Sequence, residues 1–245
     1  METNTNTAVI ENTDGEMTKT EHITKLLWWM FGITAVRLLL RISEFTGNYQ
    51  SLPDQADKII SFIIPAAAAI VLFKLGKYGK LYKASGILMG ASVIAQLLMF
   101  IMTIVFPSDS GSFLDLLRYS GVSSSVYPLY SAINSLSFYS KFAAFVLMCL
   151  GHRAFIKPVN AKLGKAWSVP VIIYGATYVS GIIFNTVQLY FPVFSDTPNA
   201  IVSIYRHADT VFMAFIFIAL VMRTFLLPVT IKKFNANQEE NEAEA

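Results

Sequence analysis

The chain has 245 residues, of which 54% are hydrophobic and only 14% are charged, and its net charge is +3. This composition is typical of a membrane protein, and it gives no reason to expect nucleic-acid binding. Cys149 is the only cysteine, which excludes an intrachain disulfide, and the three histidines lie in separate segments. We therefore expect no metal site and no cofactor.

Long apolar stretches follow one another along the chain, separated by short polar segments. A transmembrane helix needs about 20 apolar residues, and such a helix satisfies its backbone groups internally in lipid. The sequence therefore predicts an all-α, polytopic membrane protein with six transmembrane helices in one bundle. The expected spans cover residues of about 24–42, 59–73, 84–106, 127–150, 169–191 and 201–225.

Both ends of the chain are polar. Residues 1–20 are rich in Thr, Asn and Glu, and residues 234–245 are acidic, so we expect two disordered tails around a membrane domain at 21–233. The first tail has no basic start or short apolar core, so the first span is expected to be uncleaved. Between the third and fourth spans, segment 113–119 favours a short interfacial helix that is too short to cross a bilayer.

Basic residues gather on one side of the expected spans. Lysines follow the second span, Lys and Arg residues follow the fourth, and the end of the sixth span is marked by Arg223, Lys232 and Lys233. Because segments rich in Lys and Arg beside spans stay in the cytoplasm, we expect both termini there, in a plasma or inner membrane. An odd number of spans would break this agreement.

The expected sixth span carries charged residues inside an apolar run, with Arg206, His207 and Asp209 near its start. A charged side chain within a membrane costs free energy unless it faces protein or water, so these residues indicate a lined interior. His207 points about 100° away from Arg206 on a helix, and we expect it at an interface.

Polar residues also recur at helical spacing in the other expected spans. In the predicted topology most of them fall in the outer half of the membrane. Lys141 lies nearer the midplane, about two to three turns from either end of its span, so its side chain reaches a surface only with difficulty. The predicted ligand-binding residues are Arg37, Arg41, Asn134, Lys141, Asn185, Gln188, Arg206 and Asp209.

The four cations of this set outnumber the two nearby carboxylates, Glu44 and Asp209, which favours an anionic ligand. The sequence thus predicts an outward-facing cationic cavity that binds or transports an anionic small solute or a lipid headgroup. The cations would attract the anion and the three amide side chains would orient it, while Asp209 would hold Arg206 in place.

Other interpretations stay open. Arg41 with Glu44, and Arg206 with Asp209, are three residues apart and could pair within one helix, while amide side chains often join helices. An enzyme acting on a lipid-linked anionic substrate is an alternative, although HExxH, GxSxG and P-loop motifs are absent and we assign no catalytic residue. A non-catalytic scaffold subunit is a third, whose charges would meet a membrane-protein partner or a second copy of the chain.

Overall fold

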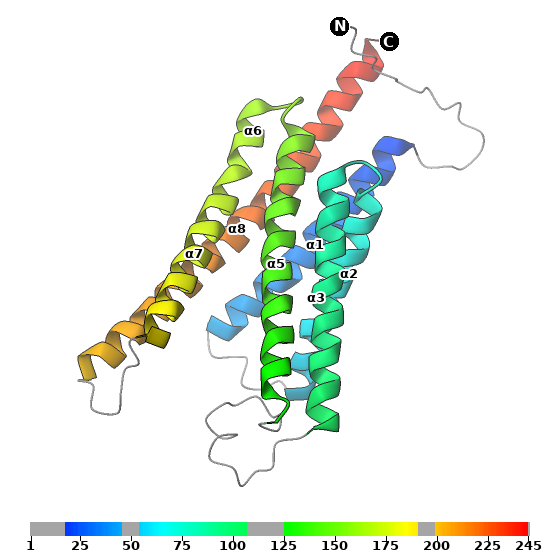
Figure 1. Cartoon of the computed structure of the whole chain (residues 1–245). Coiled ribbons are helices and arrows are strands. Elements are labelled where there is room, and N and C mark those ends of the chain that lie inside the picture. The colour runs from blue at the N-terminus through cyan, green and yellow to red at the C-terminus, as the bar shows by residue number, and fades with distance from the viewer. Residues whose placement is uncertain (1–17, 46–53, 107–124, 191–198, 245) are drawn as a thin grey trace, which may run out of the picture.

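The computed structural model describes the backbone of residues 18–45, 54–106, 125–190 and 199–244. Within these ranges, the side chains at 44–45, 54–59, 61, 184–190 and 199–209 lie outside the described part. All regular structure in the described ranges is helical (Figure 1). The helices are α1 (Lys19–Phe45), α2 (Asp54–Leu75), α3 (Lys80–Val105), α5 (Tyr127–Ile156), α6 (Ala161–Ala166), α7 (Ser168–Tyr190) and α8 (Asn199–Ala243).

Each expected span coincides with a helix. Among the described residues, five helical stretches are long and apolar enough to cross a membrane, and they lie in α1, α3, α5, the consecutive helices α6 and α7, and α8. In α2 the described apolar stretch, Phe62–Leu75, is shorter. The chain is therefore an all-helical, multi-pass membrane protein, whereas the count of six spans and the cytoplasmic termini stay predictions. Segment 113–119 lies outside the described residues.

Helix α8 extends further than the sequence pattern predicts, because it continues to Ala243. Phe234 is buried against Phe155, with ring centroids 4.7 Å apart. The Asn235 Oδ1 atom accepts a hydrogen bond of 2.8 Å from Thr24 Oγ1. These contacts anchor the first two residues of segment 234–245, for which the composition predicts disorder. Its acidic composition predicts solvation but does not reveal that its first residues meet α1 and α5.

Local signals in the sequence explain where two of the helices begin. The Thr18 backbone N–H donates to Glu21 Oε2 and the Glu21 N–H donates to Thr18 Oγ1, which is a reciprocal cap at the start of α1. The Asn160 side chain caps α6 by accepting a hydrogen bond of 2.9 Å from the Leu163 N–H.

The start of α1, the α2–α3 turn, the α5–α6 turn and the last turns of α8 lie together at one end of the bundle (Figure 1). His22 Nδ1 is 2.6 Å from the Tyr78 hydroxyl in the α2–α3 turn, and Trp167 Nε1 donates to Thr230 Oγ1. We call this the basic end, because it carries the lysines of both turns.

Small residues allow α3 to pack closely against its neighbours. A Cβ atom on Gly86 would lie 2.9 Å from the Phe73 backbone nitrogen of α2. On the other side, Ser85 Oγ donates a hydrogen bond of 2.7 Å to the Ala144 carbonyl oxygen of α5. Serine and glycine at helix contacts are typical of bundles in lipid, where close approach and interhelical hydrogen bonds replace the hydrophobic effect.

Candidate functional site

A buried guanidinium lies in the interior of the bundle. Arg223, near the middle of α8, is only 5% exposed. Its Nη2 atom donates a hydrogen bond of 2.8 Å to Thr34 Oγ1 of α1, and its Cζ atom lies 5.4 Å from the centre of the Phe145 ring of α5. Its Nε atom is buried and has no hydrogen-bond partner. Three helices thus enclose this cation, and one of its donors is unsatisfied.

The helix register explains why Arg223 meets Thr34. Helices α1 and α8 are antiparallel, because Thr24 pairs with Asn235 as Thr34 pairs with Arg223. Thr34 is fully buried, and its hydroxyl donates to the Met30 carbonyl oxygen one turn earlier. This bond orients the Thr34 oxygen, which leaves its lone pairs to accept from the guanidinium.

Lys141 of α5 lies close enough to Arg37 and Arg41 of α1 for their positive charges to act on its ammonium group. All three side chains are half-buried. Arg37 also acts electrostatically on Arg223. Thus the positive charge of Arg37 repels the cations of two other helices, Lys141 of α5 and Arg223 of α8.

These four residues, Arg37, Arg41, Lys141 and Arg223, form what we call the cation cluster. Phe145 and Thr34 both contact Arg223, and Lys141 and Arg37 lie about one turn from them along their helices. Because α5 and α1 run in opposite directions, both steps lead away from the basic end. Arg41 follows one turn beyond Arg37, so the cluster extends over roughly 10 Å along the bundle.

The described carboxylates lie far from the cation cluster in sequence. Every acidic side chain that the structure describes belongs to the first turn of α1 or to residues 239–244 at the end of α8. In the described part of the chain, therefore, neither Arg223 nor Lys141 has a carboxylate partner.

The other predicted binding residues are not among those that surround Arg223 in the described part of the chain. Asn134 of α5 is exposed and lies two turns before Lys141 on the same helix, and its predicted contribution to binding stays a prediction. The predicted contributions of the remaining residues stay predictions, because their side chains lie outside the described part: Asn185, Gln188, Arg206 and Asp209. The backbone of Arg206 precedes Arg223 on α8 by about 25 Å of helix axis. The described cations therefore gather around Arg223, at a different level from Arg206.

Sequence reasoning missed Arg223, which we interpreted as a flanking residue that ends the sixth span. The available signal was the apolar sequence on both sides of Arg223. In the structure, Leu220 and Leu227 on its two sides are both buried. The sequence places a proline at 228, inside α8, which invites the interpretation that the span ends there.

A second buried polar group lies nearer the basic end. His152 is fully buried, and its Nδ1 atom shares a hydrogen bond of 2.7 Å with the Tyr82 hydroxyl. Its ring packs on Trp167 with centroids 4.4 Å apart, and its Nε2 atom has no hydrogen-bond partner.

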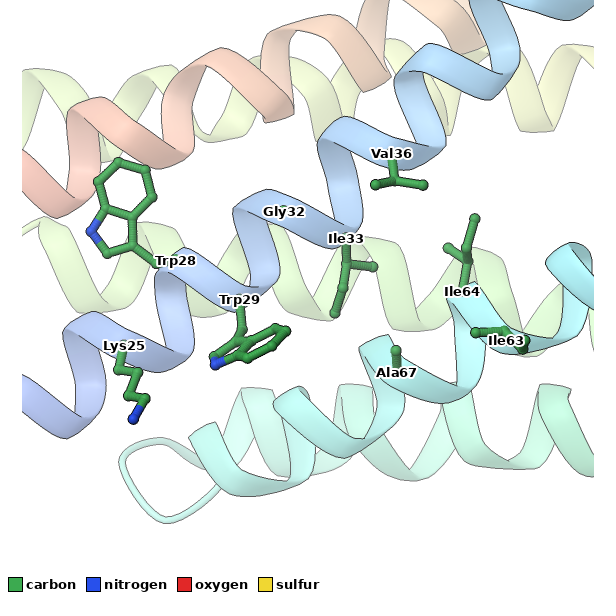
Figure 2. Close-up of a pocket in the computed structure, with 9 residues that line it drawn as sticks. All are labelled: Lys25, Trp28, Trp29, Gly32, Ile33, Val36, Ile63, Ile64 and Ala67. Atoms are coloured by element: carbon green, nitrogen blue, oxygen red, sulfur yellow. The ribbon is translucent and has the colours of Figure 1, made fainter.

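An apolar groove lies along α1 and α2 (Figure 2). It is lined by residues including Trp29, Ile33, Ile63 and Ala67, with Lys25 at one end. The predicted binding residues whose side chains the structure describes do not line it: Arg37, Arg41, Asn134 and Lys141. In the described part of the chain, no three His, Cys, Asp or Glu side chains come together as metal ligands would.

The fold and these charges define a multi-pass helical membrane protein with cations inside its bundle. Comparison with known protein families, curated proteins and solved structures finds no match to this chain.

Proposed function

We propose that this protein binds an anion inside its helix bundle, either a small anionic solute or the headgroup of an anionic lipid. The observation that carries the proposal is the Arg223 guanidinium, which is buried among three helices with an unpartnered Nε atom. An anion at the cation cluster would supply the missing acceptor.

The cost of burying charge supports this proposal. An arginine or lysine at the centre of a membrane helix costs about 3 kcal/mol even by the lower measures, and a buried charge without a partner costs several kcal/mol. One hydrogen bond to a hydroxyl and one aromatic ring offset part of this cost for Arg223. A bound anion would offset more, since charge-assisted hydrogen bonds to arginine are strong.

Each residue of the cation cluster has a distinct part in this proposal. Arg223 forms the inner wall of the site, and Thr34 and Phe145 hold it. Lys141 and Arg37 lie about one turn farther from the basic end than Arg223 does, and they attract the anion from there. Arg41 extends the positive field further in the same direction. In the predicted orientation that direction is outward. The predicted roles of Arg206, Asp209, Asn185 and Gln188 belong to the outer part of the same path.

Thermal unfolding of the purified full chain tests the proposal. Wild-type protein in detergent is heated with each of a set of anions: inorganic phosphate, citrate, a dicarboxylate and a short-chain phosphatidylglycerol. A ligand that binds only the folded state raises the melting temperature by mass action. We expect such a shift for at least one anion, and we expect Lys141→Met to reduce it.

Lys162→Met is the matched control, because Lys162 is exposed in α6 at the basic end. It removes the same charge and should leave the anion-dependent shift unchanged. If no anion shifts the wild type, and Lys141→Met is as stable as the wild type, the binding proposal fails. A scaffold role would then fit the buried charges better.

A further inference from the structure

A second region of the molecule, between α1 and α2, is hollowed and mostly apolar. Two adjoining cavities of about 550 and 400 Å³ lie along the seam between α1 and α2, and Lys25, Trp29, Ile33 and Ala67 line both. Figure 2 shows Trp29 and Ile33 on α1 reaching toward Ala67 and Ile64 on α2. The two cavities therefore form one continuous groove, separate from the cation cluster.

The groove changes in character along its length. The end of the groove that is farther from the basic end is lined by Val36 and Ile63, which offer only apolar contacts. Its other end is lined by His22, Lys25 and Lys74, which places two lysines beside the apolar channel at the basic end. An occupant that fits both ends has an apolar body and an anionic head.

The length of the groove matches half a bilayer. From Lys25 to Val36 the α1 axis advances roughly 16 Å. The hydrocarbon core of a bilayer is about 30 Å thick, so one leaflet is about 15 Å. Trp28 and Trp29, which are 47% and 61% exposed, follow Lys25 by one turn, at the level where tryptophan meets headgroups.

We propose that this groove binds one anionic phospholipid of the bilayer, with an acyl chain along Trp29, Ile33 and Ile63 and the phosphate between Lys25 and Lys74. Charge complementarity selects this occupant over a neutral lipid. In the predicted orientation the basic end faces the cytoplasm, where anionic lipids are enriched.

Lipid binding to the delipidated full chain in detergent tests the inference. The probes are phosphatidylglycerol and phosphatidylcholine with identical acyl chains, and native mass spectrometry counts the lipids retained at each concentration. We expect phosphatidylglycerol to bind more tightly. The Lys25→Gln, Lys74→Gln double variant should weaken its binding by about 25-fold, which is the effect expected for two lysines near an anionic surface.

Two pairs of controls make the test specific. Gly32 is exposed and lines the groove, and a Cβ atom there would meet nothing within 4 Å, so a large side chain in Gly32→Phe can enter the groove and should block it. A Cβ atom on Gly175 of α7 would also meet nothing within 4 Å, and Gly175 does not line the groove, so Gly175→Phe should bind lipid as the wild type does. Lys162→Gln with Lys165→Gln removes two exposed lysines elsewhere at the basic end and should have little effect.

Equal binding of the two lipids by the wild type would overturn the inference, as would normal phosphatidylglycerol binding by folded Gly32→Phe. Lys141→Met distinguishes this site from the cation cluster, because it should leave binding in the groove unchanged. Lipid binding that is lost in Lys141→Met and kept in Gly32→Phe would assign the lipid to the cation cluster and overturn the groove site.

Discussion

Arg223 Nη2 donates a hydrogen bond of 2.8 Å to Thr34 Oγ1 and so connects the middle of α8 to the middle of α1. Both side chains are buried, and they come from helices that are far apart in the sequence. This bond fixes the position of the guanidinium on which the proposed anion site depends.

Thr34→Val should lower the free energy of unfolding by about 1–2 kcal/mol, because it removes the acceptor of Arg223 while keeping the side-chain shape. Thr177→Val is the matched control. Thr177 is also buried, but its hydroxyl donates only to the Ile173 carbonyl oxygen of its own helix. Denaturant titration of the two variants in detergent measures the difference. Equal loss in both would show that the Arg223 bond contributes nothing of its own.

Gly86→Ala should destabilise the protein by about 1–3 kcal/mol, because its new methyl group would lie 2.9 Å from the Phe73 backbone nitrogen and force α2 and α3 apart. Gly175→Ala meets nothing within 4 Å and should be neutral or stabilising by up to about 1 kcal/mol. Melting temperatures of the two variants under one set of conditions give the comparison. A Gly86→Ala variant as stable as the wild type would contradict the close packing of this seam.

The pair formed by Tyr82 and His152 should show energetic coupling. Tyr82→Phe removes the hydroxyl that bonds His152 Nδ1 and leaves both ring nitrogens of a fully buried histidine without a partner. We expect a loss of about 1–3 kcal/mol. A double-mutant cycle with His152→Phe should give a coupling free energy of about 1 kcal/mol. Strictly additive effects would mean that the hydrogen bond is not formed.

Shortening α8 should separate its structural part from its solvated part. A chain ending at Lys233 loses Phe234 and Asn235, which contact Phe155 and Thr24, and should be less stable by about 2 kcal/mol. A chain ending at Ala236 keeps both contacts and should behave as the wild type. Thermal unfolding of both chains decides, and equal melting temperatures would support the disordered tail that composition predicts.

The positions of the long apolar helices could be predicted from the sequence, because lipid imposes long apolar stretches that composition reveals directly. The end of α8 could not be, since the burial of Phe234 depends on α5, which is distant in the sequence. Hydropathy along one helix does not say which other helix lies beside it.

The candidate site could be predicted from the sequence only in part. The sequence selects Lys141 as hard to explain at a surface, and the structure finds it beside the charges of Arg37 and Arg41. Arg223 was interpreted as a topology signal, because a positive-inside pattern and a proline after it are equally consistent with the end of a span. The hydrogen bond to Thr34 is what distinguishes a buried arginine from a flanking one.

The most direct test of the central claim is the affinity of the folded protein for the anion that stabilises it most, measured by titration for the wild type, Arg223→Gln and Arg223→Lys. Glutamine carries no charge, and its amide group reaches only to about the position of the arginine Nε atom. The account therefore predicts binding that is weaker by about 10–100-fold, with lysine recovering part of the loss. Equal affinity of Arg223→Gln and the wild type would contradict the claim that this buried guanidinium holds the anion.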